Sequence, residues 1–225
     1  MAVAIVADAH LGGPGGEAGP LVEQLREVPT LGAERLVLLG DLLQVWVGYE
    51  QYQTDTSRAL LDAVAFVRAR GVRVDYIEGN RDFFLDRGAC RDAFDSVGTE
   101  LAFEVGGTRY LAVHGDGLND RDRQYLAWRW LSKSALSRLA MSSLPRRVVG
   151  PFVERTERKL SRTNFKHRAR IPEEAIRAFA ARRLAQGHDV LMLGHFHEAR
   201  RWRIEEGEIR LLEAWFNSRR VEWLR

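Results

Sequence analysis

Apolar and polar positions along the chain form blocks that predict short strands separated by helices. The apolar runs with the length and composition of strands are Val3–Ala7, Leu36–Leu39, Val72–Glu78, Tyr110–Val113 and Val190–Leu193. Between Asp55 and Arg70, apolar residues recur at helical spacing, and Gly71 follows as a stop signal. This alternation favours an α/β layered fold, and the length suits a single domain over residues 1–225.

Further elements are expected before and after these runs. Helices are predicted near Leu21–Val28 and over Glu173–Ala185, the second with Pro172 at its start. Gly106-Gly107 predicts a hairpin between Phe103–Val105 and Tyr110–Val113. Closing antiparallel strands are expected over Trp202–Ile204, Ile209–Trp215 and Val221–Leu224.

The pattern changes between about residues 120 and 170. Here polar motifs no longer follow strand-like runs, and apolar residues recur at mostly helical spacing, interrupted at Pro145 and Pro151. We therefore predict a helical insertion, or cap, of two or three helices within the single domain.

Charge is distributed unevenly. Residues 121–170 hold fourteen Lys and Arg against three Asp and Glu, a local charge of +11, although the whole chain carries +3. Such a segment suits an anion, which could be nucleic acid, lipid headgroups or a phosphorylated substrate. The alternative is a solvated helical surface without a partner.

Composition excludes several classes of protein. An apolar fraction of 45% argues against disorder, and a lone cysteine, Cys90, excludes an internal disulfide. No apolar run reaches the roughly 18–20 residues of a membrane span, and no signal peptide is visible at the start. A cytoplasmic location is expected.

The candidate chemistry lies where the strand-like runs end. Carboxylate, amide and imidazole groups follow them, and these are the ligands that divalent metal ions prefer. The candidate ligands are Asp8, His10, Asp41, Asn80, His114, His195 and His197. In an extended backbone, Asp8 and His10 would point to the same side. Because sites in open sheets form at the carboxyl ends of strands, we expect all seven to converge.

These motifs also carry a family resemblance. The ordered set Asp8-x-His10, Gly40-Asp41, Gly79-Asn80-x-Asp82, His114-Gly115-Asp116 and Gly194-His195-x-His197 resembles the signature of calcineurin-like metallophosphoesterases. Gly79–Phe83, Trp46 and the basic, apolar insertion resemble one branch, the UDP-2,3-diacylglucosamine hydrolases of lipid A biosynthesis. The resemblance extends from Ala4 to about Trp215.

The resemblance implies an α/β/β/α sandwich of two sheets with a helical cap, and a site for two divalent ions, often Mn²⁺. Asp8, His10 and His197 would bind one ion, Asp41 would bridge, and Asn80, His114 and His195 would complete the second. Catalytic roles are implied for Asn80, Arg81 and His114. The implied substrate-binding residues are Asn80, Arg81, Asp122, Tyr125, Thr163, Asn164, Lys166 and His195.

The implied reaction is hydrolysis of the diphosphate of UDP-2,3-diacylglucosamine to UMP and 2,3-diacylglucosamine 1-phosphate. Arg81 stands where the superfamily usually has a histidine. A guanidinium is a poor proton donor, but its planar fork suits phosphate oxygens. The basic, apolar insertion would suit peripheral docking on the cytoplasmic face of the inner membrane.

Two alternatives remain open at this point. The chain could be another calcineurin-like phosphoesterase that acts on nucleotide diphosphates or phosphodiesters, although Arg81 and the long insertion speak against this. It could also be a nucleic-acid-binding module with a vestigial metal site. Retention of all seven candidate ligands argues against the second alternative, so no nucleic-acid partner is expected.

Overall fold

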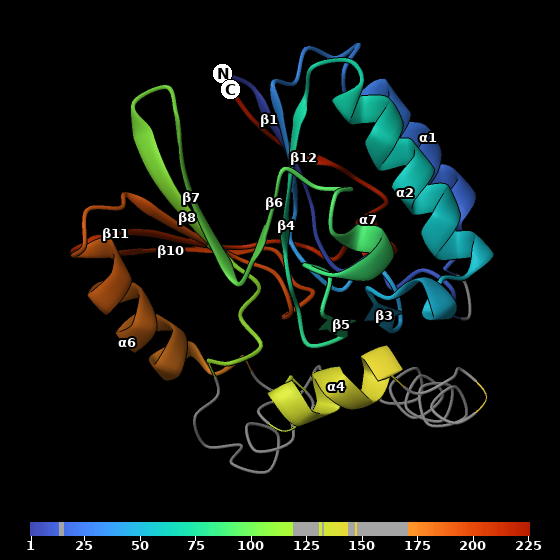
Figure 1. The fold of residues 1–225 in the computed structure, drawn as a ribbon. Helices are drawn as coiled ribbons and strands as arrows, with labels where there is room; N and C mark the ends of the chain where they lie inside the picture. Colours follow the sequence, from blue (N-terminus) through green and yellow to red (C-terminus); the bar gives the residue numbers. More distant parts are fainter. Residues whose placement is uncertain (14–15, 119–130, 132, 144–146, 148–170) are drawn as a thin grey trace.

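A computed structural model describes residues 1–13, 16–118, 131, 133–143, 147 and 171–225 (Figure 1). One five-stranded sheet has the order β12-β1-β2-β4-β6, and a second has the order β10-β11-β9-β8-β7. The first is built from β1 (Val3–Val6), β2 (Arg35–Leu38), β4 (Arg73–Ile77), β6 (Ser96–Gly98) and β12 (Glu222–Leu224). The second is built from β7 (Glu100–Val105), β8 (Thr108–Val113), β9 (Val190–Leu193), β10 (Arg200–Ile204) and β11 (Gly207–Leu211).

The strands that precede the candidate site run parallel within each sheet. β1, β2 and β4 are parallel neighbours, as are β8 and β9. The antiparallel strands lie outside them: β12 pairs with β1, β7 with β8, and β10 with β11. Parallel neighbours end at the same edge of a sheet, so the polar residues after these strands are brought to one side of the molecule.

The helices cover the outer faces of the two sheets. α1 (Ala18–Glu27) and α2 (Asp55–Arg68) lie side by side against the first sheet, whereas α6 (Glu173–Leu184) lies against the second (Figure 1). Between the sheets, Ile5 and Val37 pack with Ala112 and Met192 in a shared apolar layer. These layers confirm the predicted α/β/β/α sandwich.

Periodicity located the longer elements well. α2 begins after a capping box formed by Thr54 and Ser57, and the predicted hairpin is present as β7 and β8. The predicted strand over Ile209–Trp215 is partly wrong: β11 ends at Leu211, and Trp215 begins the short helix α7 (Trp215–Ser218). β11 pairs with β9, whose last residue, Leu193, lies opposite Leu211, so the pairing ends there.

The short elements lie near the candidate site. β3 (Trp46–Val47) pairs with β5 (Asp82–Phe83), and two 3₁₀ turns occupy Glu50–Tyr52 and Gly88–Cys90. Helix α4 (Ala135–Ser143) lies alongside β3 and β5 (Figure 1). There Met141 packs with Phe83 and Phe84, and its carbonyl oxygen accepts a hydrogen bond from Gln51 Nε2 at 3.0 Å.

α4 belongs to the predicted insertion, whose other residues lie mostly outside the described ranges. The single domain with a cap at about 120–170 therefore stays a prediction. None of the described helices combines the length and the apolar character needed to span a bilayer.

Candidate metal centre

The candidate ligands lie in the loops that follow β1, β2, β4, β8 and β9. Asp8 and His10 follow β1, Asp41 follows β2, and Asn80 follows β4. His114 follows β8, whereas His195 and His197 follow β9. The structure thus brings residues that are up to 189 positions apart in the sequence into contact.

The backbone of these loops is unusual. Seven non-glycine residues have a positive φ among those described, and five of them are candidate ligands: Asp8, His10, Asp41, His195 and His197. A positive φ is uncommon for residues other than glycine, although Asn, Asp and His adopt it more often than the rest, and such backbone strain concentrates at functional sites. The expectation of an extended backbone at Asp8 and His10 was wrong, because φ is 53° and 47° there. Their side chains nevertheless converge.

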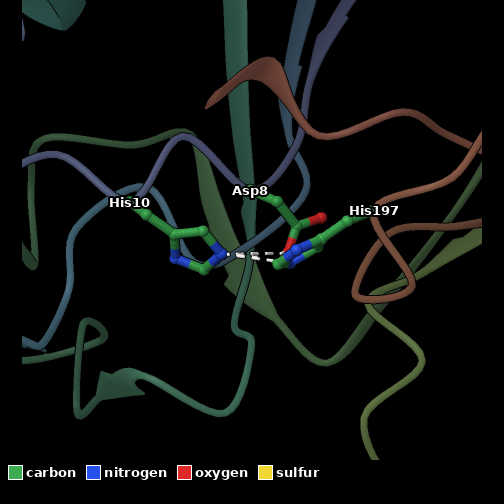
Figure 2. Close-up of side chains that lie close together, drawn as sticks. All are labelled: Asp8, His10 and His197. Carbon is green, nitrogen blue, oxygen red and sulfur yellow. Dashed lines mark hydrogen bonds and ion pairs between the residues drawn. The ribbon is translucent and has the colours of Figure 1, made fainter. Parts of the chain in front are cut away.

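Asp8, His10 and His197 form the first cluster (Figure 2). Their donor atoms lie within 4.8 Å of one another. His197 Nε2 is 3.2 Å from Asp8 Oδ1 and 3.1 Å from His10 Nε2. One carboxylate oxygen and two imidazole nitrogens directed at a common point are a donor set that suits a divalent transition metal.

Asp41, His114 and His195 form the second cluster, again with donor atoms within 4.8 Å of one another. His114 Nε2 lies 3.6 Å from Asp41 Oδ2 and 4.0 Å from Asp8 Oδ1. The second cluster therefore adjoins the first, as a dinuclear site requires.

The ring of His114 is held in a defined orientation. Its Nδ1 lies 2.9 Å from the carbonyl oxygen of Leu39, which can only accept a hydrogen bond. Nδ1 therefore carries a proton, and Nε2 faces the two carboxylates. A backbone carbonyl that orients an imidazole in this way is typical of metal ligands.

Two of the histidines favour the neutral form. Burial, followed by the positive charge of Arg81, lowers the pKa of His10 to about 3. Burial and the neighbouring His114 lower the pKa of His195 to about 4. A neutral imidazole is the form that binds a metal ion.

The carboxylates make the centre attractive to cations. Burial would raise the pKa of Asp8, but His197 and His114 outweigh it and lower the value to about 2. Burial is likewise outweighed at Asp41, where His114 and Arg81 hold the pKa below its usual range. At His114, burial is outweighed by Asp41 and Asp8, which raise its pKa to about 10. Both carboxylates are therefore ionised and stabilise positive charge between them.

Buried polar atoms that lack a hydrogen-bond partner indicate whether the site suits metal ions. His114 Nε2 and Asn80 Oδ1 are buried and lack a hydrogen-bond partner. Buried polar atoms are rarely left unsatisfied in native structures, so an orphaned pair at one site points to a missing ligand. An imidazole nitrogen and an amide oxygen are suitable donors, and the residues present therefore fit two divalent ions.

Asp82 is a member of neither cluster. It hydrogen-bonds to the backbone of the loops that carry Asp41 and Asn80. Its Oδ2 accepts hydrogen bonds from the backbone N–H groups of Asp41 at 2.9 Å and Gly79 at 2.8 Å. Burial and the nearby Asp41 raise the pKa of Asp82 to about 7.

Arg81 is buried beside the second cluster, with only 6% of its surface exposed. Its backbone N–H donates to Asp41 Oδ1 at 2.9 Å, and its Nε lies 3.3 Å from Asp41 Oδ2. Its Nη1 also donates to Gln44 Oε1. The sequence did not single out Gln44, although a polar residue within the apolar stretch Leu42–Trp46 was a usable signal.

The other predicted substrate contacts lie outside the described residues. They are Asp122, Tyr125, Thr163, Asn164 and Lys166.

No family model matches the chain, but individual relatives do. A UDP-2,3-diacylglucosamine hydrolase of Azotobacter vinelandii is 29% identical over 209 residues, which cover 89% of this chain and 82% of the relative. One from Ectopseudomonas mendocina is 30% identical over 165 residues, covering 69% of this chain and 67% of the relative. One from Aeromonas salmonicida is 33% identical over 141 residues, or 58% of this chain and 55% of the relative.

Among solved structures, a dimetal phosphatase from Danio rerio aligns over 95% of this chain and 87% of that chain. The TM-score is 0.48 and the identity is 14%, a likeness too weak to bear on function.

Proposed function

The chain belongs to the family of UDP-2,3-diacylglucosamine hydrolases, and from this we propose that it hydrolyses the diphosphate of UDP-2,3-diacylglucosamine. The products would be UMP and 2,3-diacylglucosamine 1-phosphate. The observation that carries the proposal is the pair of adjoining donor clusters in a chain that shares 30% identity with a relative of that name.

Each cluster would hold one divalent ion, which we propose to be Mn²⁺. Asp8, His10 and His197 would bind the first ion, and Asp41, His114 and His195 the second, with Asn80 Oδ1 as a further donor. When bound, two such ions activate water and neutralise charge on phosphoryl oxygens. The Asp41 carboxylate interacts electrostatically with His114 of its own cluster and with His10 of the first, which supports a bridging role for Asp41.

Arg81 would serve the substrate rather than a metal ion. Its contact with Asp41 places a permanent positive charge at the second cluster, where the diphosphate would bind. Since a guanidinium does not readily release a proton, Arg81 would stabilise phosphate charge instead of protonating the leaving group. Asn80, in the loop after β4, and His195, in the loop after β9, would also contact the substrate. Asp122, Tyr125, Thr163, Asn164 and Lys166 would contact its sugar and phosphates from the insertion.

A lipid substrate requires access to a membrane, and we propose peripheral docking on the cytoplasmic face of the inner membrane. Leu131, Leu136 and Leu139 are 53%, 72% and 63% exposed, in the segment that includes α4. They lie within the range that carries a charge of +11. Exposed apolar side chains in a basic segment suit an anionic membrane surface.

The decisive experiment identifies products by mass spectrometry after incubation of the purified protein with UDP-2,3-diacylglucosamine and Mn²⁺. UMP together with the acylated sugar phosphate is the expected result. Asp41→Asn, which replaces a donor of the second cluster by an amide of the same shape, is expected to form neither product. UDP plus free acylated sugar, or no reaction in the metal-loaded protein, would reject the proposed function.

A further inference from the structure

A buried glutamine lies between the loop that follows β1 and the loop that follows β4. Gln44 is only 2% exposed, and its neighbours in Leu42–Trp46 are apolar. Burial of an amide costs free energy unless its donor and acceptor ends are both hydrogen-bonded. The partners of Gln44 therefore indicate what the residue does.

Both ends of the amide bind to loops of the candidate metal centre. Gln44 Nε2 donates to the carbonyl oxygen of His10 at 3.1 Å. Gln44 Oε1 accepts a short hydrogen bond from Arg81 Nη1, which also lies 3.4 Å from the backbone oxygen of Gln44. One side chain thus connects the first cluster with Arg81.

Within the described part of the chain, two contacts from different directions hold the Arg81 guanidinium. Its Nε lies 3.3 Å from Asp41 Oδ2, and its Nη1 is held by Gln44. Because the group is planar and rigid, contacts at two of its nitrogens set the direction of the whole fork.

We propose that Gln44 is a positioning residue that holds the Arg81 guanidinium in one orientation beside Asp41 and ties it to the loop of His10. This inference rests on the proposed function, since Gln44 would act on the substrate only through Arg81. A pre-oriented arginine loses less conformational entropy on meeting a phosphate oxygen than a mobile one. Loss of Gln44 should therefore affect the turnover only of substrates whose phosphate groups Arg81 contacts.

The space around the amide supports this assignment. A Cβ added at Gly13 would lie 2.9 Å from Gln44 Cδ and closer still to Nε2. The amide therefore occupies space that only a glycine at position 13 leaves open. Gly13→Ala would displace the Gln44 amide while residue 44 remains a glutamine.

Three variants test the role. Gln44→Met keeps the length of the side chain but removes both hydrogen bonds, and Gln44→Glu keeps an acceptor for Arg81 and loses the donor to His10. Gly13→Ala moves the native amide. Gln53→Met is the matched control, because Gln53 is also a buried amide, 3% exposed, that bonds to Val47 O at 2.8 Å and Trp46 Nε1 at 3.3 Å.

Gln44→Met and Gly13→Ala are expected to lower kcat/KM on UDP-2,3-diacylglucosamine by roughly 10- to 100-fold, the effect of losing a charged hydrogen bond. Metal content and hydrolysis of bis-p-nitrophenyl phosphate should change far less, and Gln53→Met should retain lipid turnover. Gln44→Glu is expected to recover most of the loss. Equal losses on both substrates, an equal loss in Gln53→Met, or no recovery in Gln44→Glu would overturn the role through Arg81.

A double variant adds a stricter criterion. If Gln44 acts through Arg81, the pair Gln44→Met with Arg81→Met should be little worse on the lipid than Arg81→Met alone. Losses that simply add would contradict the inference.

The Nε–H signal of Arg81 in a ¹⁵N side-chain NMR spectrum reports orientation without any substrate. Gln44→Met should shift or broaden this signal, whereas Gln53→Met should leave it in place. An unchanged signal in Gln44→Met would overturn the positioning role whatever the substrate is. A changed signal in a protein that does not hydrolyse UDP-2,3-diacylglucosamine would reject the proposed function and leave the positioning of Arg81 supported.

Discussion

Among single residues, Gly79 shows how closely the backbone approaches the candidate metal centre. A Cβ added at this position would lie 2.7 Å from His114 Nε2 and closer still to Asp41 Oδ1. Because both atoms are candidate donors, Gly79→Ala is expected to displace them, release metal and lower turnover by about 100-fold or more. Elemental analysis and steady-state kinetics measure these losses, and circular dichroism checks that the fold is retained.

Gly19→Ala is the control for that variant. Gly19 lies in α1, where a Cβ would meet nothing within 4 Å, and alanine favours helices. Its metal content and activity should match those of the unmodified protein. Full metal content in Gly79→Ala would mean that the loop of Gly79 shifts and the metal-binding atoms of Asp41 and His114 stay in place, contrary to the expectation.

The sequence led to the candidate ligands because each follows an apolar, strand-like run. It did not reveal the left-handed backbone at Asp8, His10 and Asp41, since tertiary contacts enforce that conformation. One such contact joins the N–H of Asp41 to Asp82 Oδ2 across 41 positions of the chain. Gln44 was missed for the same reason, because its partner Arg81 lies 37 positions away.

Among the elements, α4 and the segment before it are connected to the loop that carries Asn80. Lys133 Nζ donates to the carbonyl oxygen of Gly79 at 2.9 Å and lies 3.4 Å from Glu78 Oε2. Lys133→Met keeps an apolar side chain of similar length but removes the charged donor, whose Nζ also lies 6.0 Å from the centre of the Phe83 ring. Lipid turnover is expected to fall roughly tenfold, as for one lost charged hydrogen bond. Steady-state kinetics on the lipid and on bis-p-nitrophenyl phosphate measure the effect.

Glu78→Gln separates the two contacts of Lys133. It removes the ion pair but keeps an acceptor for the N–H of Leu85, which Glu78 Oε1 binds at 2.9 Å. The loss should be smaller than in Lys133→Met if the carbonyl contact with Gly79 anchors the segment. An equal loss would assign the effect to the ion pair instead.

Predictability also differed between elements. α2 and the β7–β8 hairpin were located because long helical periodicity and a Gly-Gly turn are local signals. α7 was not expected, since Leu211 and Leu212 continue the apolar pattern towards Trp215. Only the tertiary pairing of β11 with β9 determines where that strand ends. β3 and β5 are two residues each, too short to produce a period.

For the whole molecule, the two-sheet sandwich followed from the resemblance of the motifs, whereas periodicity alone indicated only an α/β fold. The two sheets meet in a shared apolar layer to which both contribute, so the inner face of each sheet is buried by the other. The candidate clusters also join the two sheets. Asp8 and Asp41 follow strands of the first sheet, and His114, His195 and His197 follow strands of the second.

A ligand held across both sheets should stabilise the entire fold. Metal ions that bind the folded chain and not the unfolded one add about 2.7 kcal/mol per site at a free concentration of 100 times Kd. For a domain of this length, each kcal/mol corresponds to about 2–4 °C. Mn²⁺ is therefore expected to raise Tm by roughly 5–10 °C for one filled site, and a chelator should reverse the change. Differential scanning calorimetry measures it. His197→Ala, which removes a donor of the first cluster, should lose much of the increase. An equal increase in this variant would mean that the first cluster contributes nothing to the stabilisation by metal.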